Sequence, residues 1–385
     1  MGLFTAVFLF IAGATGAVIS WDHELDAALN PAFYVSDSGA HKSMLALADA
    51  VEAAHPEAEV SYLPLAVQQG EAVQIWVEPR VREGGGAAAE LAYNQIAINP
   101  VSGAEQARRN WGDVSLSREN LLPFLYKLHY SLELPEIGGI DAGSLFMGIV
   151  AIVWVLDGFV SLMLSFPHPR SWRKSFALRW RRGGHVLTFD LHRSGGVWIW
   201  LLLLTLAITA VSMNLRSQVV VPIVSSMSRL TPNPFDTMSE LVPEKQTPAR
   251  ITRAHVVEIA EAEAKRRGWT APAGGLSYSR EYGVFGVGFF SAANEHGDWG
   301  LGNPWLYFRA SDGSPAGADV PGTGSTGDLF LQAQFPLHSG RIVGVPGRVL
   351  MTLLGIAVAT LSATGLVLWW RKRKARLHTR AVRAA

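Results

Sequence analysis

The chain contains no cysteine. This absence excludes disulfides, thiolate metal sites, cysteine-ligated iron–sulfur clusters and covalent c-type haem attachment. Any metal must therefore be held by histidine or by carboxylate. The two short basic segments, 167–194 and 371–385, also contain no succession of strand, Gly-x-Gly-x-x-Gly turn and helix. No nucleotide or flavin domain is therefore predicted in them.

Apolar residues are abundant instead. Hydrophobic residues make up 49% of the 385 residues, 13 of them are tryptophan, and the mean hydropathy is positive. The net charge of +1 hides an asymmetry, because Lys and Arg cluster beside the apolar runs while Asp and Glu lie in the long polar segments. This pattern predicts a membrane protein with sizeable polar domains.

Four apolar stretches are long enough, or nearly so, to cross a hydrocarbon core about 30 Å thick, which takes roughly 20 helical residues. They are 1–21, 145–166, 197–211 with its flanks, and 345–370. The first has no basic n-region and no Ala-x-Ala-like cleavage site, so it is predicted to be a retained helix rather than a signal peptide, with its start cut short.

Basic residues near helix ends predict the orientation, because Lys and Arg are retained on the cytoplasmic side. Seven lie between the second and third apolar stretches against a single acid, Asp190, and five more lie in 371–376. Both segments and both termini are therefore expected on the cytoplasmic face of an inner membrane. The predicted order is helix 1–21, outer domain 22–138, helix 139–166, cytoplasmic loop 167–194, helix 195–213, outer domain 214–336, helix 337–370 and basic tail 371–385.

Each outer segment predicts a small α/β domain with the same order of elements. The first has helix 41–54, strands 60–65, 72–77 and 91–98, and a turn at Gly84-Gly85-Gly86. The second has helix 252–267 and strands 276–278, 284–290 and 305–309. The predicted fold class is an α-helical membrane protein whose four transmembrane helices form a parallel tandem repeat, with two periplasmic α/β domains.

A small or polar pair recurs in the last third of each apolar helix: Thr15-Gly16, Asp157-Gly158, Thr209-Ala210 and Thr364-Gly365. Three histidines precede such pairs at repeat-consistent distances, which are 28 residues for His129, 17 for His192 and 26 for His338. Counting back 17 residues from Thr15 leads to a position just before Met1. The fourth histidine of the pattern is therefore expected immediately upstream of this chain.

In a parallel repeat, equivalent residues face one another across an axis along the membrane normal. His129 and His338 should then meet near the outer surface, and His192 should lie near the inner one. At about 1.5 Å per residue, 17 residues of helix span about 25 Å, so the two sites are expected near opposite leaflets. Facing imidazoles between apolar helices are what a b-type haem requires, with the histidine nitrogens on the iron.

Neighbouring residues fit the same hypothesis. Arg341 and Arg193 could pair with haem propionates. Asp157, ionisable at membrane depth, is a candidate for proton movement or for a hydrogen bond to a neighbour. The alternative is that each histidine is an ordinary interfacial residue. His168 or His185, on the cytoplasmic loop, could replace the missing inner ligand. Outer aromatics such as Trp111, Tyr126, Trp299 and Trp305 are candidates for a substrate-binding floor or for the domain core.

The sequence resembles the PepSY-associated transmembrane family over nearly its whole length. The resemblance rests on Thr15-Gly16, Glu24-Leu25-Asp26, Asn30-Pro31, Leu128-His129, Asp190-Leu191-His192-Arg193, Trp198, Leu337-His338-Ser339-Gly340-Arg341, Thr364-Gly365 and Trp369-Trp370. It implies PepSY-like periplasmic domains, bound haem b and transfer of electrons to periplasmic ferric siderophore. Two departures are the absence of a His-Arg-Trp-like start to the first helix and Asp157 where the family commonly has threonine.

The leading hypothesis is thus an inner-membrane oxidoreductase with two haem b groups that reduces ferric siderophore and releases ferrous iron. Its electron donor would be a separate cytoplasmic reductase or membrane quinol. The protein is expected to lie in the lipid bilayer, and no nucleic acid is expected as a partner. The alternatives are a non-enzymatic sensor or assembly factor whose outer domains bind peptide, and a transporter. Neither alternative requires haem.

Overall fold

The structure is a computed structural model that describes residues 2–80, 90–232, 235, 238–241, 246 and 248–384. The turn expected at Gly84-Gly85-Gly86 lies outside the described residues. The chain divides into two compact units. The helical unit comprises Met1–Asp22, Leu125–Met227 and Ala333–Ala385, and the sheet unit comprises His23–Phe124 and Ser228–Gln332.

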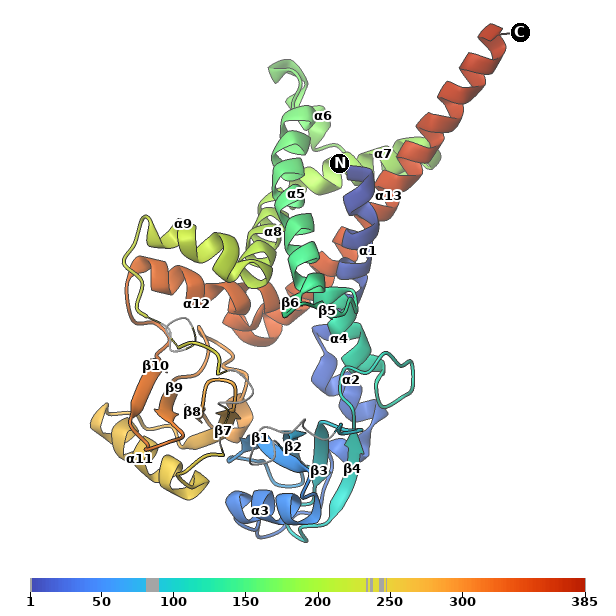
Figure 1. The fold of residues 1–385 in the computed structure, drawn as a ribbon. Coiled ribbons are helices and arrows are strands. Elements are labelled where there is room, and N and C mark those ends of the chain that lie inside the picture. Colours follow the sequence, from blue (N-terminus) through green and yellow to red (C-terminus); the bar gives the residue numbers. More distant parts are fainter. Residues whose placement is uncertain are drawn as a thin grey trace. The chain divides into compact units, whose positions relative to one another are not determined.

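Long helices dominate the helical unit (Figure 1). Its elements are α1 (Gly2–Ile19), most of α4 (Leu121–Ser131), β5 (Glu136–Ile137), β6 (Ile140–Asp141), α5 (Ala142–Ser165), η2 (Pro169–Ser171), α6 (Trp172–Ser175), η3 (Trp180–Arg182), α7 (Gly184–Trp198), α8 (Trp200–Asn214), η4 (Arg216–Val220), α9 (Val221–Ser225), the end of α12 (Thr326–Ser339), η7 (Arg341–Val343) and α13 (Gly344–Ala384).

Three helices in the described residues are long and apolar enough to cross a membrane: α1, α5 and the helix from Arg341 to Arg383. The third predicted span differs from the straight helix expected at 197–211. It is a pair of helices, α7 and α8, bent by 71°, and it raises the number of spans to four if the pair counts as one. The bend follows Ser194-Gly195-Gly196, and such Gly and Ser neighbours are a common cause of sharp kinks.

Small residues bring α1 and α13 close together. A Cβ on Gly13 would lie 2.7 Å from the carbonyl oxygen of Gly355, and a Cβ on Gly355 would lie 2.6 Å from that of Gly13. The second extensive helix pair is α5 with α8, where Gly148 accommodates Leu215. Close backbone approach at small residues is how helices associate in lipid, where apolar burial gives little driving force between them.

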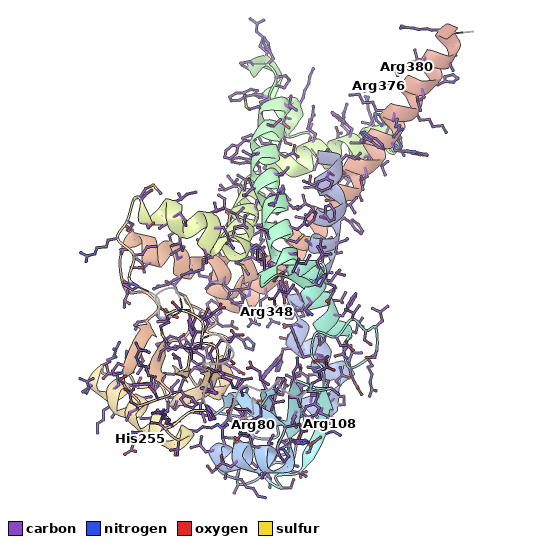
Figure 2. The ribbon with its side chains drawn as sticks, viewed as in Figure 1. Arg80, Arg108, His255, Arg348, Arg376 and Arg380 are labelled. Carbon is purple, nitrogen blue, oxygen red and sulfur yellow. The ribbon has the colours of Figure 1, made fainter. Side chains whose placement is uncertain are left out.

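The last helix, α13, is longer than a membrane crossing requires. It has 41 residues, against roughly 20 for a hydrocarbon core. Arg373 lies over the ring of Trp369 and Lys374 over that of Trp370, so these pairs mark the change from apolar to basic sequence. Arg376 and Arg380 lie farther along the exposed end of the helix (Figure 2).

The sheet unit is built around a single eight-stranded antiparallel sheet. Its strand order is β10-β9-β8-β7-β1-β2-β3-β4. The elements are α2 (Asp22–Leu29), η1 (Pro31–Phe33), α3 (Met44–Ala54), β1 (Ala58–Pro64), β2 (Val73–Pro79), β3 (Gln95–Ile98), β4 (Glu105–Arg109), α11 (Arg253–Arg266), β7 (Ala273–Ser279), β8 (Val284–Phe289), η6 (Ala292–Asn294), β9 (Trp305–Arg309) and β10 (Pro315–Asp319).

The two outer segments of the sequence meet within this sheet. Strand β1 of the first segment pairs with β7 of the second, with Tyr62 opposite Ser277 and Leu63 opposite Leu276. Residues from both segments, and from both α3 and α11, form one buried core. The two expected domains therefore share a sheet and a core. Strands β4 and β10, at the sheet edges, had no counterpart among the predicted strands.

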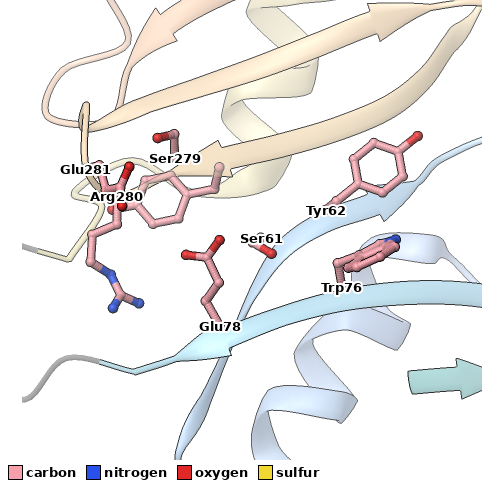
Figure 3. Close-up of a pocket in the computed structure, with 8 residues that line it drawn as sticks. Ser61, Tyr62, Trp76, Glu78, Ser279, Arg280 and Glu281 are labelled. Carbon is pink, nitrogen blue, oxygen red and sulfur yellow. The ribbon is translucent and has the colours of Figure 1, made fainter. Parts of the chain in front are cut away.

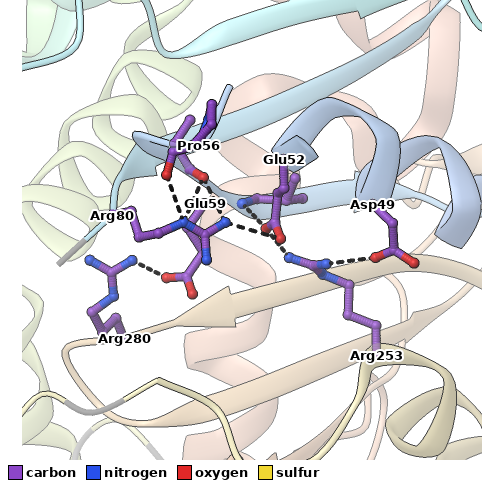
Figure 4. Close-up of polar contacts among 9 residues, drawn as sticks. Asp49, Glu52, Pro56, Glu59, Arg80, Arg253 and Arg280 are labelled. Atoms are coloured by element: carbon purple, nitrogen blue, oxygen red, sulfur yellow. Dashed lines mark hydrogen bonds and ion pairs between the residues drawn. The ribbon is translucent and has the colours of Figure 1, made fainter. Parts of the chain in front are cut away.

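Ion pairs also join the two segments (Figure 4). Arg253 at the start of α11 contacts Glu52 and Asp49 of α3, and Glu52 also lies 3.1 Å from Arg80. Farther along, Arg280 pairs with Glu59. The Glu52 and Glu59 pairs are largely buried, so losing a partner there would leave a charge poorly solvated.

Candidate functional site

His129 lies near the end of α4, with its ring against α1. Its Nδ1 is 2.9 Å from the carbonyl oxygen of Ala12 and 3.2 Å from Oγ1 of Thr15. A carbonyl oxygen can only accept a hydrogen bond, so these contacts assign the ring proton to Nδ1. In a neutral imidazole, Nε2 is then left with the lone pair that a metal ion needs.

His338 lies at the end of α12 and is held in a similar way by α8. Its Nδ1 is 2.9 Å from Oγ1 of Thr209. The Thr209 hydroxyl lies 2.9 Å from the carbonyl oxygen of Thr205 and 3.0 Å from that of Leu206, and it donates its one hydrogen within its own helix. Its oxygen therefore accepts from Nδ1 of His338, and Nε2 again keeps a lone pair.

The two rings face one another, and we call them the paired-histidine site. Their centroids are 6.1 Å apart and their planes make an angle of 59°. Imidazole nitrogens bind transition metals at about 2 Å, and the ring centre lies about 1.1 Å behind the nitrogen, so two imidazoles sharing one ion have centroids about 6.3 Å apart. His129 and His338 are therefore spaced to hold one metal ion, such as a haem iron, between them.

His192 lies on α7 and packs against α13. Its Nδ1 is 3.0 Å from the carbonyl oxygen of Leu361 and 3.3 Å from Oγ1 of Thr364. A Cβ on Gly365 would lie 3.0 Å from Cε1 of His192, so glycine at this position lets the ring approach the helix. The same tautomer follows as for His129.

Asp157 occupies the matching position on α5. A Cβ placed on Gly2 would lie 3.5 Å from its Oδ2, so the Asp157 carboxylate faces the first turn of α1. Within the described residues, no group of three or more His, Cys, Asp or Glu side chains is arranged to hold a metal ion. The candidate centre is accordingly a two-histidine one.

The register between α1 and α13 places the paired-histidine site and the His192 site closer together along the helix axis than expected. Helices α1 and α13 are antiparallel, with Gly13 against Gly355 and Trp21 hydrogen-bonded to Thr352. On this register Thr15 and Thr364 are separated by about nine residues of helix, or about 14 Å along the axis. The expected separation of about 25 Å was wrong because the helix containing His192 and Thr209 is bent by 71° and does not run straight.

The two arginines predicted to bind propionates lie beside the histidines in sequence. Arg193 donates to the carbonyl oxygen of Lys174, and its guanidinium lies 5.0 Å from the centre of the Phe189 ring. Arg341 begins η7, where its backbone N–H lies 3.4 Å from Oγ of Ser339. Pairing with a propionate remains a prediction for both.

Asp190 fixes the segment before His192. Its buried carboxylate accepts hydrogen bonds from the backbone N–H, Nε and Nη2 of Arg179, at 3.0, 2.7 and 2.7 Å. This bidentate pair ties the polar loop to the first half of α7. Sequence analysis identified Asp190 as part of a motif but did not identify its partner Arg179.

The motif residues Asp26 and Asn30 belong to a buried network in the sheet unit. Arg109 and Asp26 are 2.8 Å apart, and both residues are at most 5% exposed. Asp26 also accepts from Asn30 at 2.8 Å and from Tyr34 at 2.7 Å. These contacts satisfy the carboxylate in the interior, which indicates a structural rather than a ligand-binding role.

A pocket of 410 Å³ lies over strands β1, β2 and β7 (Figure 3). It is lined by Ser61, Tyr62, Trp76, Glu78, Tyr278, Ser279, Arg280 and Glu281. Burial raises the pKa of the Glu78 carboxyl against the opposing effect of Arg280, and the nearby carboxylates of Glu281 and Glu59 raise it further. The mixture of aromatic rings and carboxylates suits a ligand with an apolar face and hydrogen-bond donors.

The four aromatics singled out in the sequence do not line this pocket. Trp111 packs against the pocket residue Trp76, with centroids 5.5 Å apart. Trp305 lies in β9 near Phe290, and Trp299 is 70% exposed. Tyr126 lies on α4. The pocket residues were not found from sequence because they come from three strands whose pairing only the fold determines.

Three threonines that contact the site histidines were recognised in the sequence only as members of the recurring small or polar pairs. Thr15, Thr209 and Thr364 each recur at one place in an apolar helix, and this regularity was the available indication of a shared role. Their contact with histidine depends on helix packing.

Comparison with known proteins agrees with the motifs. No curated protein matches the chain. The sequence profile of the PepSY-associated TM region matches residues 1–372. The match includes all three site histidines, α1, α5, α7, α8 and most of α13, and the chain therefore belongs to the PepSY-associated transmembrane family.

Proposed function

We propose that this membrane protein is a haem-containing reductase of the bacterial inner membrane, which takes electrons from the cytoplasmic side and delivers them to periplasmic ferric siderophore. The observation that carries the proposal is the paired-histidine site. Two imidazoles from separate helices face one another at a centroid distance of 6.1 Å. Hydrogen bonds at both Nδ1 atoms leave both Nε2 atoms to bind one ion.

A bound haem b would supply one-electron transfer at this site. His129 and His338 would hold it through their Nε2 atoms. His192 would ligate a second haem whose other ligand is not identified among the described residues. Arg341 and Arg193 are the candidates for propionate pairing. Asp157, whose carboxylate faces the first turn of α1, remains a candidate for holding a proton or a hydrogen bond near the inner site.

The repeated pairing of helices supports a parallel tandem repeat with four spans. Helix α1 of the first half packs on α13 of the second, and α8 of the second half packs on α5 of the first. Within each half, a threonine of the first helix contacts the histidine that precedes the second helix: Thr15 contacts His129, and Thr209 contacts His338. A rotation that exchanges the halves would exchange these contacts, as expected for a repeat about an axis along the membrane normal.

The net chemistry is the transfer of one electron to each ferric ion, which becomes ferrous and leaves a chelator that holds it less tightly. The donor is a separate cytoplasmic reductase or membrane quinol, which is oxidised in turn. Basic segments at 170–182 and 371–376 support a cytoplasmic location of both termini under the positive-inside rule. The sheet unit then lies in the periplasm.

Absorbance of the detergent-purified protein tests the proposal. Reduction with dithionite should give an absorbance band at about 560 nm, the α band of b-type haem, because the proposal predicts haem held by two histidines. Oxidation by added ferric siderophore should remove that band and produce ferrous iron. His129→Ala and His338→Ala should each lose the haem of the paired-histidine site, with His255→Ala, an exposed histidine on α11, as the control.

A wild-type protein that takes up no haem would contradict the proposal. So would unchanged haem content in both ligand variants. Passage of siderophore or iron into liposomes without any reductant would instead indicate a transporter.

A further inference from the structure

We infer that Thr15, Thr209 and Thr364 are positioning residues that select the Nδ1-protonated tautomer of the three histidines and thereby aim each Nε2 at its metal. The inference rests on the proposed haem function, which names the ligands but not what holds them. Each threonine lies on an apolar helix and each contacts a histidine from a different helix, at 3.2, 2.9 and 3.3 Å.

The direction of these hydrogen bonds follows from counting hydrogens. A threonine hydroxyl has one hydrogen. Thr15 is 2.7 Å from the carbonyl oxygen of Ile11, and Thr364 is 2.7 Å from that of Thr360, and Thr209 likewise bonds within its own helix. Because each hydroxyl hydrogen is already donated to a backbone carbonyl, each oxygen accepts from the imidazole.

The residue after each threonine sets how closely the ring approaches. Gly16 and Gly365 leave space that a Cβ would fill, at 2.9 Å from His129 Cε1 and 3.0 Å from His192 Cε1. At both places the ring also reaches a backbone carbonyl three residues before the threonine, that of Ala12 or Leu361. The third pair has Ala210 in place of glycine.

At this third pair, Nδ1 of His338 bonds to Thr209 alone among the residues that the structure describes. The carbonyl oxygen of Leu206, three residues before Thr209, contacts the Thr209 hydroxyl at 3.0 Å and makes no hydrogen bond with His338 in the described part of the chain. His338 therefore depends on its threonine more than the other two histidines do. A partner on the far ring nitrogen fixes the orientation of a metal-bound histidine and raises its basicity as a ligand.

Thr209→Val is the sharpest test, because valine keeps the shape of threonine and removes the acceptor. Loss of such an outer partner lowers metal affinity by about 10–100-fold, so haem affinity at the paired-histidine site should fall by about that factor. Any haem retained should have a higher midpoint potential, since a less basic ligand stabilises the ferric form less. Thr209→Ser should restore both properties.

A smaller effect is expected for Thr15→Val, because the Ala12 carbonyl still accepts from His129. The matched control is Thr205→Val, one turn earlier on α8. The Thr205 hydroxyl bonds to the carbonyl oxygen of Leu201 in its own helix. Haem per chain, the potentiometric midpoint and the low-spin spectrum of the oxidised protein are the readouts, with size-exclusion profiles to compare folding.

The outcomes separate this inference from the function on which it rests. Wild-type protein without haem overturns both. Wild-type protein with haem, together with Thr209→Val indistinguishable from Thr205→Val in haem content, potential and spectrum, overturns only the positioning role. If Thr209→Val misfolds, Thr15→Val decides instead: haem content, midpoint potential and spectrum equal to those of Thr205→Val would overturn the positioning role.

Discussion

Gly13 of α1 and Gly355 of α13 face one another with no room for a side chain on either. The carbonyl oxygen of each lies within 2.7 Å of where the other's Cβ would be. This contact sets the register between the two helices, and the register in turn places Thr15 and Thr364 at their separate levels. It is thus a packing contact with consequences for both histidine sites.

Gly355→Leu should destabilise the helical unit. Overpacking of a well-packed contact costs about 1–3 kcal/mol, and here the neighbours are backbone atoms that cannot rotate away. We expect a lower melting temperature in detergent and a smaller yield of monodisperse protein. Ile356→Leu, at a neighbouring residue that is 53% exposed, should behave as the wild type. Equal melting temperatures for the two variants would show that the helices do not pack at this register.

Gly16→Ala should displace His129 from α1. The added methyl would lie 2.9 Å from Cε1 of the ring, so the ring must move away and its bond to the Ala12 carbonyl must lengthen. If haem binds as proposed, its affinity for the paired-histidine site should drop by about tenfold. Haem titration of the purified protein measures this. The reciprocal change Ala210→Gly removes a methyl and should not lower haem content, so a fall of equal size in both would argue against a steric cause.

Asp26→Ala should strongly destabilise the sheet unit. It leaves Arg109 buried without its carboxylate, and breaking a buried ion pair from one side costs about 3–5 kcal/mol. Thermal unfolding followed by circular dichroism measures the loss. Asp113→Ala removes an exposed carboxylate and should cost little. A melting temperature for Asp26→Ala close to that of Asp113→Ala would contradict the buried network.

Glu52 should make stability depend on acid pH. Burial raises the pKa of this carboxyl, but hydrogen bonds from Arg253 and the Val60 backbone outweigh burial, and the pKa is lowered from 4.5. A lowered folded-state pKa contributes stability that is complete above the unfolded value and is lost as the pH falls below about 4.5 through the folded value.

The expected result is that Glu52→Gln is less stable than wild type at pH 7 by about 1–3 kcal/mol, and that the difference shrinks as the pH falls below 4.5. Melting temperatures between pH 7 and pH 3 provide the measurement. Asp49→Asn is the control, since Asp49 also contacts Arg253 but its side chain is 74% exposed. A constant difference between Glu52→Gln and wild type across this range would contradict the assignment.

Local sequence was enough to identify most elements. The apolar runs predicted α1, α5 and α13 within a few residues at their ends, apart from the extension of α13 beyond residue 370. Strand 305–309 was predicted with its exact bounds, and Ser43 and Thr252 cap α3 and α11 as hydroxyl residues do at helix starts. The edge strands β4 and β10 were missed, because they carry few of the buried apolar residues that distinguish a strand from a loop.

By itself, the sequence was enough to predict that His129 and His338 lie together, because their similar distances from the small or polar pair of the next helix can be counted without any knowledge of contacts. Only the tertiary structure decided how they are held. The bend at Ile199, the antiparallel register at Gly13 and Gly355, and the hydroxyls of Thr15 and Thr209 on the far side of each imidazole all depend on which helix faces which. Which helices pair depends on close packing between segments that are distant in the chain, and the spacing of residues along the sequence does not reveal it.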